Sequence, residues 1–338
     1  MMKISLKNRN RRRKGKLLKF AIYGFFFNKA FSFNGFNFIP KKHDLLFWDE
    51  VKVSKCKRSY YLTGYIETPD LKEEKFIFTM QAVLTFVQQQ DVILKLIIQS
   101  ELPEYIECEF ERRGNPAPFA MYFELQKEIV QKLYNKFSDK TDKCNLTGNN
   151  YVFDDVHNAE FKSLVFKVTE PFHMRKDFIE VTHFLYFSGL EAFCKQYLKS
   201  YFPEIIIAKD SAINIAQLME KMEISYVHLN SSNSRYNLRN NSLSKTDFLK
   251  LSLSTYTNLR NKLFHENLFI AETECSNIKN AKGKYPKEEV KITDYEYYLL
   301  RLCNVVILKY IGIESKQLNC NKWYTRFPLI KDIYEGEK

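Results

Sequence analysis

The sequence predicts an α+β fold in which a β-rich N-terminal domain precedes an all-α helical bundle. Up to about residue 168, short apolar runs alternate with polar residues at the two-residue period of half-buried strands. From about residue 172 the apolar spacing becomes that of amphipathic helices. With 338 residues, 45% apolar and 27% charged, the chain has the length and composition of a folded protein of about two domains. We expect a basic tail at 1–19, a β-rich domain at 20–170 and a helical domain at 171–338.

The N-terminal half contains several short runs with strand character, separated by turn-forming residues such as Gly114-Asn115-Pro116. A longer amphipathic stretch at 119–137 predicts one helix. We therefore expect an antiparallel sheet or a small barrel with one packed helix. The expected strands are 31–38, 45–53, 60–66, 75–80, 92–98, 104–112 and 160–168.

Four helices are expected in the second half, and several of their ends carry recognisable signals. Asp210 or Ser211 can cap the second helix, and Thr293 with Glu296 forms a capping box for the fourth. Gly312 ends that last helix. The polar stretches 228–245 and 271–291 are expected to be loops. The predicted helices span 172–201, 211–224, 246–266 and 293–311, and together form a bundle.

The net charge of +12 is unevenly distributed, because residues 1–19 contain five lysines, four arginines and no acid. The remaining residues carry only +3. A basic tail can bind phosphate backbones through counterion release, or it can simply be a solvated terminus. The sequence leaves both readings open.

Several classes of protein are disfavoured by absent motifs. No glycines follow the GxGxxG or GxxxxGK[ST] patterns, so no glycine-loop cofactor site is expected. The seven cysteines never form CxxC and the six histidines never form HExxH, so neither a disulfide framework nor a zinc site is expected. An acidic run, Pro69-Asp70 followed by Glu73-Glu74-Lys75, is too compact to place its carboxylates on separate strands of a metal-dependent nuclease. With no apolar run of about 18 residues, we expect a cytoplasmic protein that does not span a membrane.

The residues that stand out are Arg260, Asn261 and His265 in the segment YTNLRNKLFHEN. Arg260 falls within an apolar helical stripe, and burying an unpaired guanidinium is costly, so it must be paired or serve a polar site. A candidate partner is Glu191, in the middle of the apolar first helix; alternatively Glu191 emerges on a narrow solvent-facing stripe. The stripe around Arg260 consists of Leu249, Leu253, Tyr256, Leu263 and Phe264.

The pattern Arg-Asn-x-x-x-His on the penultimate helix, with Glu191 in Ser-Gly-Leu-Glu-Ala-Phe, resembles the HEPN domain. More narrowly, it is similar to the Apea-like HEPN proteins of bacterial anti-phage defence, in which a β-rich domain precedes the bundle. The resemblance covers about 172–315, and FSFNGFNFIP and Tyr-Leu-Thr-Gly-Tyr-Ile extend it to the N-terminal half. One HEPN toxin subgroup has a tyrosine two residues after the histidine. Here Asn267 occupies that position, which separates this chain from toxins silenced by nucleotide transfer onto that tyrosine.

This resemblance implies a metal-independent endoribonuclease without a cofactor, acting as a toxin in anti-phage defence or abortive infection. His265 would transfer protons, Arg260 would stabilise the phosphoryl transition state, and Asn261 would orient phosphate or imidazole. Glu191 would hold Arg260 in place.

The implied partners are an RNA substrate, a second copy in a homodimer that pools two motifs, and a phage-derived trigger or an antitoxin. The N-terminal domain would sense the signal. The alternative is a catalytically inactive HEPN-like protein that binds RNA or serves as a scaffold.

Overall fold

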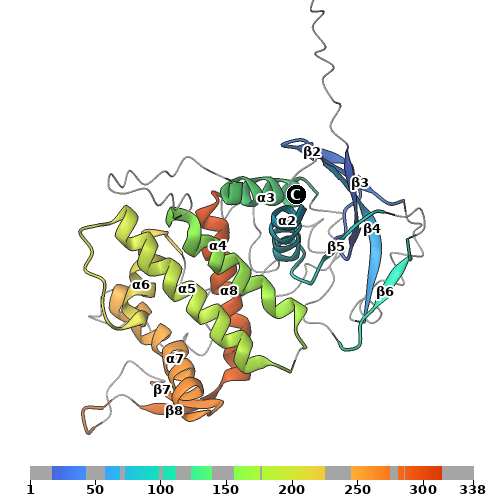
Figure 1. Ribbon diagram of the computed structural model, residues 1–338. Helices are drawn as coiled ribbons and strands as arrows, with labels where there is room; N and C mark the ends of the chain where they lie inside the picture. Colours follow the sequence, from blue (N-terminus) through green and yellow to red (C-terminus); the bar gives the residue numbers. More distant parts are fainter. Residues whose placement is uncertain are drawn as a thin grey trace, which may run out of the picture.

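The computed structural model describes residues 17–42, 58–68, 73–98, 102–111, 123–138, 156–175, 177–224, 245–274, 281–284 and 286–313. These residues confirm the predicted α+β class, with an antiparallel sheet at one end of the molecule and most helices at the other (Figure 1). Residues 1–16 of the expected basic tail, the expected strand 45–53 and the expected loop 228–244 lie outside the described residues.

The sheet has the order β2-β3-β4-β1-β5, with β6 pairing to the other end of β4, and every described pairing is antiparallel. One face of the sheet packs on helices, because Phe20 and Ile22 of β1 and Ile66 of β4 join the main core. The strands are β1 (Leu18–Tyr23), β2 (Phe31–Phe33), β3 (Phe36–Pro40), β4 (Ser59–Thr68), β5 (Ile93–Leu96) and β6 (Tyr105–Glu107).

The run predicted as one strand at 31–38 is a hairpin. Asn34 and Gly35 have φ angles of 47° and 83°, the left-handed backbone that a two-residue hairpin turn requires. The phenylalanines on either side bury on the same face, where the rings of Phe31 and Phe38 stack with centroids 4.3 Å apart. The expected strands at 60–66 and 92–98 are confirmed, whereas that at 104–112 is reduced to Tyr105–Glu107.

Two of the expected strands are helices instead. Residues 75–80 belong to α2 (Glu73–Gln88) and residues 160–168 belong to α4 (Val156–Thr169). In α4, the buried Phe161, Leu164, Val165 and Val168 recur every three to four residues, which is the helical period. A short apolar run does not distinguish a strand from a buried helix, so the error lies in the period assigned to it. The expected helix 119–137 is α3 (Phe123–Ser138) in the described residues.

The helices of the second half largely agree with prediction: α5 (Ile179–Tyr201), α6 (Ser211–Lys221), α7 (Lys245–Glu266) and α8 (Ile292–Tyr310). A short 3₁₀ helix, Glu170–His173, precedes α5. The Asp210 carboxylate caps α6 by accepting from the Ala212 N–H at 2.9 Å. The predicted capping box of α8 is wrong, because Lys291 is the N-cap residue and makes no side-chain cap. Gly312, with φ of 73°, follows α8 as expected.

The stretch 271–291, predicted to be a loop, instead contributes two strands beside α7 (Figure 1). Strands β7 (Ile270–Glu274) and β8 (Lys287–Lys291) pair antiparallel, with Ala271 opposite Val290. Both of those side chains are buried, whereas most of their described neighbours on the two strands are exposed. One buried pair is too weak a pattern to predict a strand from the sequence. Packing against α7 stabilises the two strands instead.

The main hydrophobic core runs from Phe20 in β1 to Ile313 after α8, and so joins the sheet to the bundle. A second, smaller cluster around Tyr23 and Leu62 lies apart from it. A buried amide pair adds to this contact, because Asn304 of α8 donates through Nδ2 to Gln89 Oε1 at 2.7 Å. Helix α4, which precedes the predicted boundary at residue 170, packs against both α5 and α8. Within the part of the chain that the structure describes, no helix is both long and apolar enough to cross a bilayer.

Candidate functional site

Helix α7 carries Arg260, Asn261 and His265, and presents them in two directions. Residues three and four positions apart share a helix face, so Asn258, Asn261 and His265 lie along one side. All three line a groove beside the helix. Arg260 lies on the adjoining face, which turns toward α5. The sequence motif is therefore split between the groove and the helix–helix contact.

The Arg260 guanidinium is half-buried between two aromatic rings. Its central carbon is 6.0 Å from the ring centroid of Phe187 on α5 and 5.6 Å from that of Phe264, one turn along α7. Both distances are within the range of cation–π attraction. The Nη1 atom donates to Asn261 Oδ1 at 2.8 Å. The apolar stripe thus accommodates the charge with two rings and one amide.

Glu191 does not form the expected ion pair with Arg260. Its carboxylate, 20% exposed, accepts from Lys195 Nζ at 2.9 Å and from the Ser211 hydroxyl, which ties α5 to α6. Burial by itself would raise the pKa of Glu191, but the Ser211 and Lys195 hydrogen bonds and the charges of Lys195 and Arg260 lower it below its ordinary value. Arg260 therefore acts on Glu191 through its field rather than through contact.

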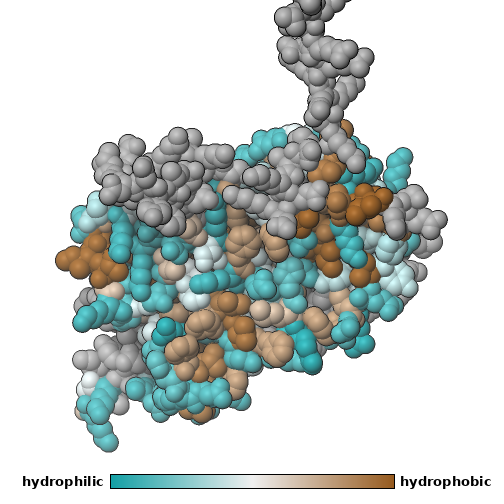
Figure 2. Space-filling model, viewed as in Figure 1, coloured by the Kyte–Doolittle hydropathy of each residue, from teal (hydrophilic) through white to brown (hydrophobic). Residues whose placement is uncertain are grey.

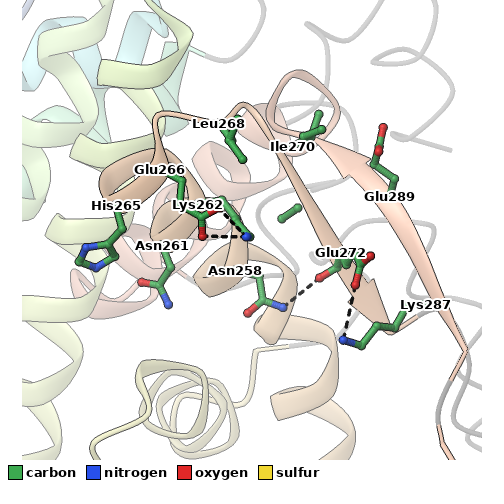
Figure 3. Close-up of a pocket in the computed structure, with 11 residues that line it drawn as sticks. Asn258, Asn261, Lys262, His265, Glu266, Leu268, Ile270, Glu272, Lys287 and Glu289 are labelled. Carbon is green, nitrogen blue, oxygen red and sulfur yellow. Dashed lines mark hydrogen bonds and ion pairs between the residues drawn. The ribbon is translucent and has the colours of Figure 1, made fainter.

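The groove has a volume of about 650 Å³ and lies between α7 and the β7–β8 hairpin (Figure 3). The exposed His265 lies at one side, and the hairpin residues lie at the other. Arg260 is not among the lining residues, but Asn261 lines the groove and binds Arg260, so it connects the two. The lining residues are Asn258, Asn261, Lys262, His265, Glu266, Leu268, Ile270, Ala271, Glu272, Lys287 and Glu289.

Both lysines of the groove are paired with carboxylates. Lys262 Nζ lies 2.7 Å from each carboxylate oxygen of Glu266, and Lys287 Nζ lies 3.6 Å from Glu272 Oε2. Asn258 fixes the wall, since its Nδ2 donates to the backbone carbonyl of Glu272 at 3.2 Å. The groove therefore has a defined shape with little free positive charge.

The hairpin side of this groove was not predicted from the sequence. Glu272, Lys287 and Glu289 fall in the stretch expected to be a loop. Asn258 could have been found, because it precedes Asn261 by three residues and so shares its helix face.

His183 of α5 is fully buried next to α7. The backbone of Tyr256 is close enough to raise its pKa slightly, yet neither ring nitrogen has a partner in hydrogen-bond geometry. Burial dominates and lowers the pKa of His183 to about 4. A neutral imidazole therefore packs between the two helices that carry the motif residues.

Other residues considered from the sequence add no second site to the described structure. Across the described ranges, no three His, Cys, Asp or Glu side chains lie close enough together to hold a metal ion. Asp70 of the acidic run, His43 and His228 lie outside those ranges.

Comparison of the chain with protein-family models, with curated proteins and with solved structures finds no match. The resemblance to HEPN domains therefore stays an expectation from the sequence motifs.

The buried His183 predicts a pH-dependent stability. Its pKa is about 4 in the folded chain and about 6.5 when unfolded, so the folded state binds this proton less readily. The contribution of the neutral His183 to the free energy of unfolding is fully present above pH 6.5. It is lost as the pH falls toward 4, where the free energy of unfolding should be lower by about 3 kcal/mol. His183→Leu should remove that part of the loss in denaturant unfolding measured between pH 4 and 7.

Gln196→Leu, a substitution on α5 away from α7, is the control and should keep the wild-type pH slope. An unchanged slope in folded His183→Leu would contradict the burial of a neutral imidazole at this position.

Proposed function

We propose that the chain is a metal-independent HEPN-type endoribonuclease that cleaves RNA by attack of a ribose 2′-hydroxyl. The observation that carries the proposal is the position of Asn261, which binds the Arg260 guanidinium and lines the same groove as His265. The reaction needs a cation and a proton-transfer group; here the cation is bound to an amide that lines the same open groove as the imidazole.

In this reaction a base removes the proton of the 2′-hydroxyl, and the freed oxygen bonds to the adjacent phosphorus. The bond from phosphorus to the 5′-oxygen breaks, and an acid protonates the leaving oxygen. The products are a 2′,3′-cyclic phosphate and a 5′-hydroxyl. Histidine suits either proton transfer near neutral pH, so we assign one of them to the exposed His265.

Arg260 would stabilise the negative charge that builds up on the phosphorane-like transition state. Its planar guanidinium can bind two phosphate oxygens at once, which a lysine ammonium cannot do with the same geometry. Phe187 and Phe264 hold the group in a partly apolar environment, where a charge–charge interaction is stronger than in water. Asn261 accepts from the guanidinium and also lines the groove, so it links Arg260 to the groove. Glu191 supports this arrangement through its field and its attachment of α5 to α6.

A homodimer would complete the site, because one His265 cannot serve easily as both acid and base. Large apolar side chains surround His265 and are exposed: Phe264 by 61%, Leu268 by 42% and Phe269 by 45%. Figure 2 shows apolar surface among polar side chains on this side of the bundle. A two-fold contact through these residues would cover them and bring a second His265 to the scissile phosphate.

The biological setting is proposed from the resemblance. The protein would act in the cytoplasm in anti-phage defence or abortive infection, with the N-terminal domain sensing a phage-derived trigger or an antitoxin. One observation favours the alternative, a catalytically inactive RNA-binding or scaffold protein: the Arg260 guanidinium contacts two rings and Asn261, and does not line the groove. RNA cleavage assays on the His265→Ala variant distinguish the ribonuclease from the inactive RNA-binding or scaffold protein.

His265→Ala should lower RNA cleavage by about 10²–10⁴-fold, the usual contribution of a general acid or base. Wild-type cleavage should proceed in EDTA and leave cyclic phosphate and 5′-hydroxyl ends, read by end-group analysis of a labelled RNA. Lys199→Ala, an exposed change on α5, is the control and should cleave like wild type. Activity that requires added Mg²⁺, or that survives in His265→Ala, would contradict the mechanism.

Subunit mixing should show that the site is shared between two chains. In an equal mixture of wild type and His265→Ala after subunit exchange, about one quarter of the dimers contain two intact chains. If both histidines are needed, activity should fall to about that quarter of the undiluted wild-type value. Retention of one half, or a chain that is monomeric by light scattering while it cleaves RNA, would contradict a composite site.

A further inference from the structure

A run of four polar residues, from Gln88 to Asp91, is buried at the end of α2 and in the turn that leads to β5. Burying polar side chains is costly unless each has a hydrogen-bond or charge partner. Gln88 Oε1 accepts from the backbone N–H of Phe26, which follows β1, at 3.1 Å. Gln89, with a φ of 52°, binds Asn304 of α8. The turn therefore contacts both the sheet half of the molecule and the bundle.

The carboxylate of Asp91 in this turn is only 3% exposed and connects two further elements. Its Oδ2 accepts from the hydroxyl of Tyr60 on β4. Its Oδ1 lies 2.6 Å from Nδ1 of His173, outside hydrogen-bond geometry but as an ion pair when the imidazole is protonated. A buried carboxylate needs such partners, because its charge has left water. Asp91 thus joins a strand of the sheet to the 3₁₀ helix that precedes α5.

Tyr60 and His173 lie in differently packed parts of the fold. Tyr60 belongs to the smaller apolar cluster around Tyr23 and Leu62, whereas the helix that follows His173 packs into the main core. Apolar contacts are non-directional, whereas hydrogen bonds to a buried charge are directional and strong. The chain Tyr60–Asp91–His173 therefore holds β4 and the segment before α5 in one relative position.

The first part of α5 also carries rings that contact the Arg260 site. Phe187 faces the guanidinium at 6.0 Å, and Phe184 stacks on Phe264 of α7 with ring centroids 5.8 Å apart. Both phenylalanines lie within about the first three turns of α5. A shift at the start of α5 would therefore reach the rings that enclose Arg260.

We propose that Asp91 is a latch between the sheet and the bundle, and that it passes a displacement of β4 to the N-terminal end of α5. The latch has two arrangements, with the Tyr60 hydroxyl bound to Asp91 or released from it. Coupling between distant sites requires a two-state element of this kind. Release leaves the buried carboxylate with fewer partners, so the His173 segment and the start of α5 are held less firmly. Control of the Arg260 site by this latch rests on the proposed ribonuclease function, whereas the latch itself does not.

Tyr60→Phe tests the latch, because it removes one hydroxyl and keeps the ring in its apolar cluster. Amide hydrogen exchange of the full chain, followed by mass spectrometry, should become about tenfold or more faster in residues 177–187. The increase should be smaller in α6, which reports global unfolding. Unchanged exchange in 177–187, or an equal increase in α6, would overturn the proposal.

Tyr65→Phe is the matched control, since it removes a hydroxyl from the same strand where the ring contacts Lys19 and not Asp91. It should leave exchange in 177–187 at the wild-type rate. An increase equal to that of Tyr60→Phe would contradict a specific role for the Tyr60 hydroxyl.

A double-mutant cycle of Tyr60→Phe and His173→Gln tests whether both side chains act through one carboxylate. Each single change should lower the Tm, and the two effects should be non-additive, because the two residues share Asp91 as their partner. Additive changes in Tm would contradict the latch.

RNA cleavage by the same variants separates failure of the latch from failure of the ribonuclease proposal. Faster exchange in Tyr60→Phe, with no cleavage by any chain including wild type, would support the latch and contradict the ribonuclease. Cleavage by wild type with unchanged exchange in Tyr60→Phe would support the ribonuclease and overturn the latch. Faster exchange with cleavage at the wild-type rate would overturn control of the Arg260 site by Asp91.

Discussion

The placement of one guanidinium, that of Arg260, governs the rest of this site. The charge sits in an apolar helical stripe, where it needs partners. Two aromatic rings and the Asn261 amide provide them, and Phe187 makes α5 part of the arrangement. Asn261 accepts from Arg260 through Oδ1, which leaves its NH₂ group as a donor beside the groove. His265 follows one turn later, where the helix ends and the side chain is exposed. One helix therefore carries a cation, an amide that binds it and an exposed imidazole within about two turns.

The hairpin gives this helix a second function. Without β7 and β8, the face of α7 that carries Asn258 and His265 would be open surface; with them it becomes one wall of a groove. The hairpin also carries Glu272 and Glu289 in opposed positions, an arrangement that weakens the strand pair. The groove that results contains Asn261 and His265, whereas Arg260 lies on the adjoining face of α7.

The parts of the structure that could be predicted share one property, which is a strong local signal. Helix α7 has a long amphipathic period, Asp210 caps α6, and Gly312 has the positive φ that ends α8. The α2 and α4 segments lacked such a signal, because their short apolar runs fit both periods. The hairpin buries little beyond Ala271 and Val290, so its pattern resembles a loop. The expected Glu191–Arg260 pair does not form, because Lys195 and Ser211 lie nearer to the carboxylate. Which of these residues pairs with Glu191 depends on distances between helices, and these cannot be derived from residue spacing along the chain.

Arg260→Lys tests the central claim most directly, because it keeps the positive charge and removes the planar fork. The variant should remain folded, with a Tm near that of wild type, since Phe187 and Phe264 still enclose a cation. Its RNA cleavage rate at saturating substrate should fall by about 10²-fold or more, the usual loss when a transition-state donor is misplaced. A folded Arg260→Lys chain that cleaves RNA at nearly the wild-type rate would contradict the role assigned to the guanidinium.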